Sequence, residues 1–164
     1  MEAARQMIWL LLGGAVLAGE PTYELSELRG WLGRDLPAVQ ESLGATASVR
    51  EGAGYQRTSG LTMVWNKAEH LGWIAYLEAG QVVLLHVQPL PDQDAHSAIR
   101  DALGEPELSL PSRASKKAVQ WVWPDHGVAV SVEKDVTNFI DVFQPCTADD
   151  YQAQWYQEPD PFTK

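Results

Sequence analysis

The sequence predicts an α+β protein of two tandem units, each a helical element followed by an antiparallel meander, with the helices packed on one face of the sheet. Strand-like segments rich in β-branched and aromatic residues run from Val64 to Pro89 and again from Trp121 to Pro145. A helical pattern of apolar residues precedes each run. The short connections favour antiparallel pairing, because parallel strands need crossovers of about a dozen residues or more.

The composition is that of a globular protein and argues against a nucleic-acid partner. The chain has 164 residues, of which 45% are hydrophobic and 21% are charged, so it can bury a sizeable core. Acidic residues number 22 against 12 basic, and the net charge of -10 opposes binding to phosphate backbones. The short basic run Arg113–Lys117 is typical of a solvated loop. The single cysteine, Cys146, excludes an intramolecular disulfide.

The N-terminus predicts a secretory signal peptide over residues 1–18. The apolar run Ile8–Ala18 is shorter than the roughly 20 residues of a membrane span and suits the hydrophobic part of a signal. Val16 and Ala18 are the small residues expected before a cut at Gly19, and an N-terminal helix is the alternative. No cysteine lies near the cut, so we expect a periplasmic or secreted protein without a stable membrane anchor.

The first unit spans residues 19–91 and begins with two short helices. The first is expected from Thr22, its N-cap, to Gly33, with leucines at helical spacing on one face. The second is capped by Asp35 and stops at Gly44. Nothing basic lines this pair, so DNA recognition is not indicated.

The strands of the first unit follow a glycine-rich stretch. We expect a strand fragment at Thr46–Arg50 and then a mobile loop as far as Gly60. Three strands come next, with a tight turn at Ala79–Gly80, and they are predicted at Leu61–Asn66, Trp73–Glu78 and Val82–Gln88.

The second unit, residues 92–145, repeats this pattern with one helix. The helix is expected over Asp92–Leu103, and a loop through Pro111 then leads to Ala118. Three strands follow, ending at Trp123 and spanning Val128–Glu133 and Asn138–Gln144. One sheet face is expected to be buried and one open.

Residues 146–164 form an acidic and aromatic tail. Thr147 and Asp150 have the spacing of a capping box, and Tyr151 and Trp155 lie four residues apart on a short helix ended by Pro159. The tail either packs across an end of the sheet or serves as an arm that docks on a partner.

The two halves can be aligned as an internal repeat. Trp65 then pairs with Trp123, and Val87-Gln88-Pro89 pairs with Phe143-Gln144-Pro145. Chance similarity between two ordinary α+β segments is the alternative.

The segments DLPAVQESLGAT and MVWNK in the first half, and HSAIRDALGEP and WVWPDHGVAV in the second, resemble the SmpA/OmlA (BamE-like) envelope domain. The tandem arrangement is similar to that of beta-lactamase inhibitor protein. Two departures are the missing lipid-attachment cysteine and the missing first helix of the second half. The resemblance implies an exported protein whose sheet or loops bind another protein.

Catalytic and metal-binding signals are weak. The four histidines lack metal-ligand spacing, and there is no G-x-S-x-G, P-loop or G-x-G-x-x-G motif. We therefore predict no catalytic residue, metal or cofactor. His70 and His126 each follow a carboxylate and precede a glycine turn, which indicates exposed turn residues.

The preferred hypothesis is an exported, non-enzymatic protein-binding module, either an envelope assembly factor or an inhibitor or immunity-type protein, whose partner the sequence does not identify. Aromatic residues and one turn histidine are the candidate contacts, because such side chains often anchor interfaces: Trp73, Tyr76, Trp123, His126, Trp155 and Tyr156. The alternative is a small hydrolase or carbohydrate-binding module that uses the open sheet face through Trp73, Tyr76, His70 or His126.

Overall fold

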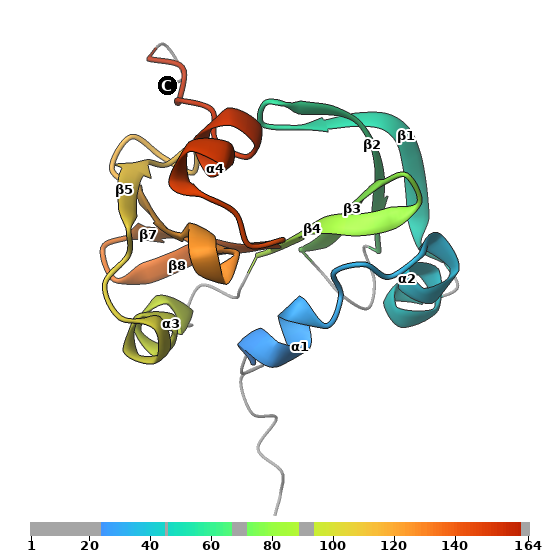
Figure 1. Ribbon diagram of the computed structural model, residues 1–164, viewed down its shortest axis with the longest axis horizontal. Helices are drawn as coiled ribbons and strands as arrows, with labels where there is room; N and C mark the ends of the chain where they lie inside the picture. The colour runs from blue at the N-terminus through green and yellow to red at the C-terminus, as the bar shows by residue number, and fades with distance from the viewer. Residues whose placement is uncertain (1–23, 45, 67–71, 89–93, 162–164) are drawn as a thin grey trace, which may run out of the picture.

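A computed structural model of the chain describes residues 24–44, 46–66, 72–88 and 94–161. Within these residues eight strands form one antiparallel sheet in the order β1-β2-β3-β4-β8-β7-β6-β5 (Figure 1). The strands are β1 (Ser48–Tyr55), β2 (Thr58–Trp65), β3 (Trp73–Glu78), β4 (Gln81–Val87), β5 (Leu108–Pro111), β6 (Val119–Trp123), β7 (Val128–Glu133) and β8 (Val136–Phe143). The α+β class is confirmed, and no described helix has the length and apolarity to cross a membrane.

Two four-stranded meanders meet at the centre of the sheet, where β4 pairs with β8. The neighbouring cross-strand pairs there are Leu85 with Val142 and His86 with Asp141. Because paired residues point to the same face and successive residues alternate, these two pairs face opposite sides of the sheet.

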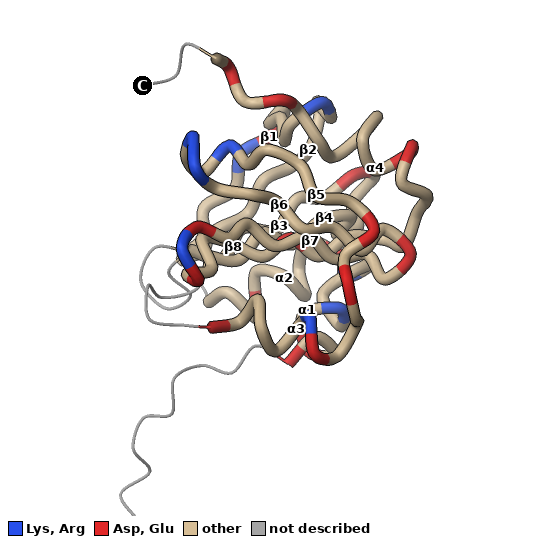
Figure 2. The backbone as a smooth tube through the Cα atoms, turned by 90° about the vertical axis from the view of Figure 1, so that its left-hand side faces the viewer, with Lys and Arg blue, Asp and Glu red and all other residues tan. Residues whose placement is uncertain are grey.

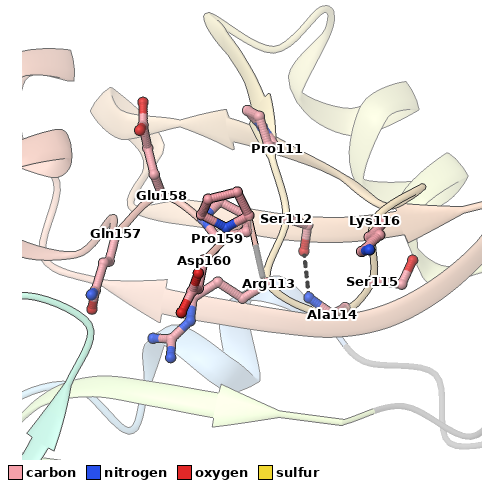
Figure 3. Close-up of a pocket in the computed structure, with 11 residues that line it drawn as sticks. Pro111, Ser112, Arg113, Ala114, Ser115, Lys116, Gln157, Glu158, Pro159 and Asp160 are labelled. Carbon is pink, nitrogen blue, oxygen red and sulfur yellow. Dashed lines mark hydrogen bonds between the residues drawn. The ribbon is translucent and has the colours of Figure 1, made fainter. Parts of the chain in front are cut away.

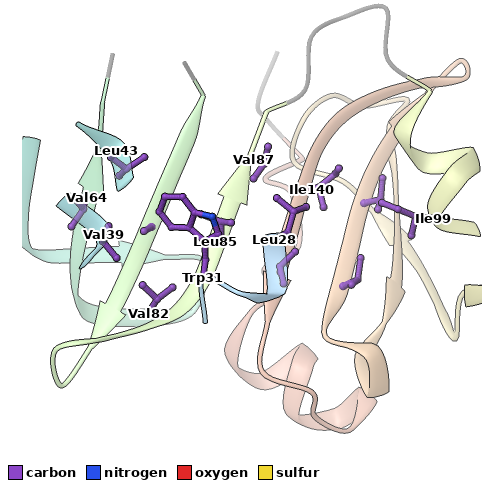
Figure 4. Packing of buried hydrophobic residues seen from close by; sticks show 14 of the residues in the cluster. Leu28, Trp31, Val39, Leu43, Val64, Val82, Leu85, Val87, Ile99 and Ile140 are labelled. Carbon is purple, nitrogen blue, oxygen red and sulfur yellow. The ribbon is translucent and has the colours of Figure 1, made fainter. Parts of the chain in front are cut away.

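The helices are divided between the two faces. Helices α1 (Leu25–Arg29), α2 (Leu36–Leu43) and α3 (Ala95–Leu103) cover one face, whereas α4 (Ala148–Gln154) lies over the other (Figure 1). Figure 4 shows the helix-side core, in which side chains from α1, α2 and α3 pack on strand residues such as Val64, Leu85 and Ile140. The α4-side core contains Tyr76, Leu84 and Phe143 together with Tyr151 and Trp155.

Several local predictions are confirmed. Strand β3 has the expected bounds, and the Ala79–Gly80 turn has positive φ at both residues (49° and 80°), as a tight hairpin requires. Asp35 caps α2, since its side chain accepts a hydrogen bond from Ala38 N. Thr147 caps α4 in the same way, accepting from Asp150 N. The predicted starts Thr22 and Asp92, and the signal peptide, lie outside the described residues.

Two predicted loops are wrong, because both segments are strands. The glycine-rich stretch forms β1, which turns at Gln56 (φ 55°) and pairs with β2. Register shifts between Arg50 and Ala53 and between Ala53 and Tyr55 accommodate the glycines as bulges, so the strand bends instead of breaking. The segment Leu108–Pro111 was expected to be loop but forms β5, an edge strand, which tolerates a proline.

The residue-by-residue alignment of the two halves is also wrong. Val87 belongs to the helix-side core and its assigned counterpart Phe143 to the α4-side core. Trp123 faces the helices, whereas Trp65 pairs with Ile74, which packs on the α4 side. A slip of one residue exchanges the two faces of a strand, so these pairs cannot be equivalent within one sheet.

Candidate functional site

The predicted partner-binding residues do not form one surface. Tyr76, Trp155 and Tyr156 are buried together in the α4-side core. Trp123 is buried on the helix side, where its Nε1 donates to Gly104 O at 3.0 Å. Trp73 is half-buried, with its ring centroid 5.5 Å from that of Trp31.

Of the two candidate histidines, the structure describes one. His126 is exposed in the turn Pro124–His126, and its carbonyl accepts from Arg29 Nη2 at 2.8 Å. His70 lies outside the described residues. The six partner-binding residues thus stay a prediction, and among them Trp73 and His126 alone are not buried.

A different set of polar side chains gathers on the α4-side face of the sheet. His86 in β4 and Asp141 in β8 are direct cross-strand partners at the sheet centre. Tyr55 comes from the end of β1, at the edge of the sheet, because the bulged β1–β2 hairpin bends over this face towards α4 (Figure 1). The hairpin is held there by Thr58 Oγ1, which donates to Gln154 O at 2.7 Å.

Both carboxylate oxygens of Asp141 are occupied. Oδ1 lies 2.7 Å from His86 Nδ1, and Oδ2 accepts from the Tyr55 hydroxyl. Asp141 is 1% exposed and His86 8%. Burial, followed by the charge of Asp141 and this hydrogen bond, raises the pKa of Tyr55 well above its ordinary value, so the phenol keeps its proton and donates it. We name Tyr55, His86 and Asp141 the polar triad.

The triad fixes the tautomer of the imidazole. A carboxylate only accepts hydrogen bonds, so Nδ1 of His86 carries the proton that faces Asp141, and Nε2 has a free lone pair in the neutral ring. Aromatic rings hold the imidazole in place, with centroids at 5.1 Å for Phe139 and 5.9 Å for Tyr55.

His86 is one of the residues that line a recess of about 390 Å³. Nε2 has no hydrogen-bond partner among the described residues. It is also not a buried atom, since Gln120 Oε1 is the buried side-chain atom without a partner in the described part of the chain. Nε2 is therefore accessible, and because His86 lines the recess we infer that Nε2 faces it. The lining combines amide, aromatic and cationic side chains: Tyr55, Gln56, His86, Gln88, Arg113, Ala114, Asn138 and Phe139.

Hydrogen-bond donors remain available in this lining. Arg113 uses Nη1 to donate to Gln56 Oε1 at 3.4 Å, and its remaining N–H groups have no partner in the described part of the chain. Asn138 donates one amide hydrogen to Ser131 Oγ at 3.2 Å and keeps a second. None of the eight described lining residues is acidic, and a lining with free donors and no carboxylate suits a ligand that carries acceptor groups or negative charge.

A larger recess of about 910 Å³ adjoins the first and shares Arg113 and Ala114 with it. Figure 3 shows the loop Pro111–Lys116 facing the tail segment 157–161 across this space. The basic residues on the loop, Arg113 and Lys116, are balanced by Glu158 and Asp160 on the tail. The described lining of this larger recess therefore has no excess charge that would favour a ligand of either sign. Figure 2 shows the wider setting, in which acidic residues are spread over the molecule and basic residues form small, separate groups.

Sequence reasoning missed the triad. A histidine and an aspartate interrupt the otherwise largely apolar strands QVVLLHV and VTNFIDVF, and this interruption was the available signal. It did not reveal that the two strands are neighbours. Within the described residues no group of three or more His, Cys, Asp or Glu could hold a metal ion.

Comparisons with protein-family models, with curated proteins and with solved structures found no match for this chain.

Proposed function

We propose that the protein binds a small, carboxylate-bearing molecule in the recess beside His86. The observation that carries this proposal is the imidazole itself, which Asp141 holds at 2.7 Å while its Nε2 faces the recess. A fixed acceptor at the base of a polar hollow is the kind of group that orients a ligand.

The position of the triad supports a functional interpretation. A buried carboxylate is costly unless it is paired and hydrogen-bonded, and well-packed apolar residues in its place are often as stable or more stable. Asp141 and His86 lie in the two central strands, between the apolar neighbours Ile140 and Val142 on β8 and Leu85 and Val87 on β4. Folding alone gives little reason for a polar pair at this place.

The lining indicates the chemical class of the ligand. Arg113 offers several N–H groups to a carboxylate, for which its planar guanidinium is well suited. Tyr55 and Phe139 provide aromatic walls for an apolar body, and Nε2 of His86 accepts from a hydroxyl or amide of the ligand.

The test is a titration of the labelled protein with small monocarboxylates and their uncharged amides, followed through the His86 imidazole resonances. We expect saturable shifts with carboxylates and a loss of about tenfold or more in affinity in Arg113→Gln, since a hydrogen bond to a charged group contributes about 1.5–3 kcal/mol. Lys117→Gln is the matched control, because Lys117 belongs to the same loop but does not line the recess. Absence of saturable shifts with every carboxylate would refute the proposal.

A protein-binding function, in an exported protein, is the second proposal, and the edge strand β1 supports it. The residues Ser48–Gly52 are exposed, Val49 is 40% exposed, and β1 pairs only with β2 among the described strands. An unpaired strand edge can accept a strand from a partner. A photo-crosslinker at Val49 is expected to capture a partner from an envelope extract, whereas the same group at exposed Val136 captures none. Equal capture at both positions contradicts the proposal.

The division into two related units is likewise proposed. The strand order is symmetric about the β4–β8 pair, and α1–α3 lie on the same face of the sheet, which supports a duplicated helix-and-meander unit. Under this proposal equivalent residues of the two halves lie on the same face of the sheet. The alignment of the halves then differs by one residue from the alignment that the sequence suggested.

A further inference from the structure

We propose that the recess is an active site in which His86 acts as a general base and water hydrolyses a small ester that carries a carboxylate. This inference rests on the ligand-binding function proposed above and extends it from binding to chemistry. Its starting point is the polar triad, whose geometry leaves a single reactive lone pair, that of His86 Nε2, facing the recess.

The three members of the triad have separate roles. Asp141 accepts the Nδ1 proton at 2.7 Å, fixes the tautomer and stabilises the imidazolium that forms during proton transfer. Tyr55 holds the second carboxylate oxygen, which prevents the carboxylate from rotating away from the histidine. Tyr55 and Asp141 are therefore positioning residues, and His86 is the group that exchanges a proton with the reactants.

Water is the nucleophile in this proposal, because the described residues of the lining supply none of their own. The eight described residues that line the recess include no serine, threonine, cysteine or lysine, and the Tyr55 hydroxyl is already engaged with Asp141. A histidine with a free Nε2 and room beside it can deprotonate a water molecule directly.

The chemistry balances without an added reactant. Nε2 takes a proton from water while the water oxygen forms a bond to the ester carbonyl carbon, which gives a tetrahedral oxyanion. The carbonyl re-forms, the bond to the leaving alkoxy oxygen breaks, and the Nε2 proton passes to that oxygen. One ester and one water yield one carboxylic acid and one alcohol.

The surrounding donors favour acyl chemistry over glycoside cleavage. The second amide hydrogen of Asn138 and the N–H groups of Arg113 are available to an oxyanion and to the carboxylate of the substrate. Glycosidases commonly use two carboxyl groups that flank the bond. The described residues that line this recess include no carboxylate, and Asp141 lies behind the imidazole with both oxygens occupied.

The experiment measures release of nitrophenolate from mono-4-nitrophenyl succinate by the full chain, with 4-nitrophenyl acetate as the uncharged comparison. We expect His86→Gln to lower kcat/KM by about 100-fold or more, the lower end of typical general-base contributions. Lys117→Gln is the matched control, since Lys117 belongs to the loop that carries Arg113 but does not line the recess. Its kcat/KM should equal that of the unchanged protein.

A positioning role is separated from a structural one by Asp141→Asn, which keeps the volume and an acceptor for Nδ1. A lower kcat with unchanged KM, an unchanged near-ultraviolet circular dichroism spectrum and a cooperative melt supports the inference; an unchanged kcat overturns it. This variant also decides the matter if His86→Gln fails to fold.

Binding and catalysis can fail separately. Saturable binding of succinate with no hydrolysis above the rate of His86→Gln overturns the inference and leaves the binding function intact. Absence of hydrolysis together with absence of saturable binding by every carboxylate tested refutes both proposals. Equal losses in His86→Gln and Lys117→Gln would show that the loss of hydrolysis does not depend on the recess and would also overturn the inference.

Discussion

Asp141 shows how a single residue can set the chemistry of a surface. Its side chain is almost fully buried, yet both oxygens are bonded, one to a histidine and one to a tyrosine. Such a group is stable only while both partners stay in place. The same contacts that satisfy the carboxylate leave the far nitrogen of His86 available to the recess.

Alkaline pH is expected to destabilise the fold through buried tyrosines. Burial first, and then the charge of Asp141, raises the pKa of Tyr76 from 10.0 to about 12. The folded protein thus holds this proton more tightly than the unfolded chain does. The resulting stabilisation is complete below the unfolded-state pKa and is lost as the pH rises through the folded-state value of about 12.

Urea unfolding at a series of pH values from neutral to strongly alkaline tests this expectation. The free energy of unfolding should decrease above about pH 10. In Tyr76→Phe the decrease should be smaller, because one of the titrating groups is gone. An identical pH dependence in the variant and the unchanged protein would contradict the assignment to Tyr76.

Gly127 is expected to tolerate no side chain. Its φ is 66°, and a Cβ at this position would lie far inside van der Waals contact with the Phe143 carbonyl oxygen. We expect Gly127→Ala to lower the free energy of unfolding by about 2–4 kcal/mol. Gly80→Ala is the control, since Gly80 also has positive φ but has open space around it; its loss should be nearer about 1 kcal/mol. Equal losses in chemical denaturation would contradict the steric explanation.

At the scale of elements, the β1–β2 hairpin builds one wall of the site and is held in place by α4 and the segment that follows it. The hairpin carries Tyr55 and Gln56, and Gln56 Oε1 accepts from the backbone N of Gln157, just beyond α4, at 3.0 Å. Tyr156 continues the connection, as its hydroxyl donates to Pro111 O at 3.1 Å. Three segments far apart in the chain are thereby joined around one face of the sheet.

The α4 segment is expected to be part of the folded core. Trp155 is 8% exposed and packs in the α4-side core, so Trp155→Ala should cost about 3 kcal/mol or more in thermal or urea denaturation. Val136→Ala is the control, because Val136 is 37% exposed and its truncation should change stability by about 0.5 kcal/mol or less.

Deletion of residues 147–164 should lower the melting temperature strongly. Unchanged stability with lost partner binding would instead indicate a docking arm.

At the scale of the whole molecule, one sheet joins both halves. Strands β4 and β8 pair through four registered residue pairs, and Leu85, Val87, Ile140 and Val142 at this seam are fully buried. Separation of the halves would expose these side chains to water. The polar triad also needs both halves, since Tyr55 and His86 come from the first and Asp141 from the second.

We therefore expect a single cooperative unfolding transition. Tryptophan fluorescence and far-ultraviolet circular dichroism should give the same urea midpoint. A fragment of residues 19–91 alone should be unfolded or aggregated, because β4 would lose its partner strand. Two separate transitions, or an independently folded fragment, would contradict this expectation.

The sequence by itself determined the α+β class, most strand positions, the Asp35 and Thr147 caps and the Ala79–Gly80 turn. These features depend on residues close together in the chain, through hydrogen bonds to nearby backbone groups or the alternation of apolar side chains. It failed for β1, because bulges disguised the strand as a glycine-rich loop, and for β5, because a short edge strand has little pattern of its own.

Only the tertiary structure decided where the site lies. His86 and Asp141 are 55 residues apart and Tyr55 and Asp141 are 86 apart, so their contacts depend on β4 pairing with β8 and on the hairpin bending over the sheet. The same reason explains why two tryptophans expected at a binding surface, Trp123 and Trp155, are core residues. Strand order and sheet curvature follow from the packing of the whole chain, and no local pattern encodes either of them.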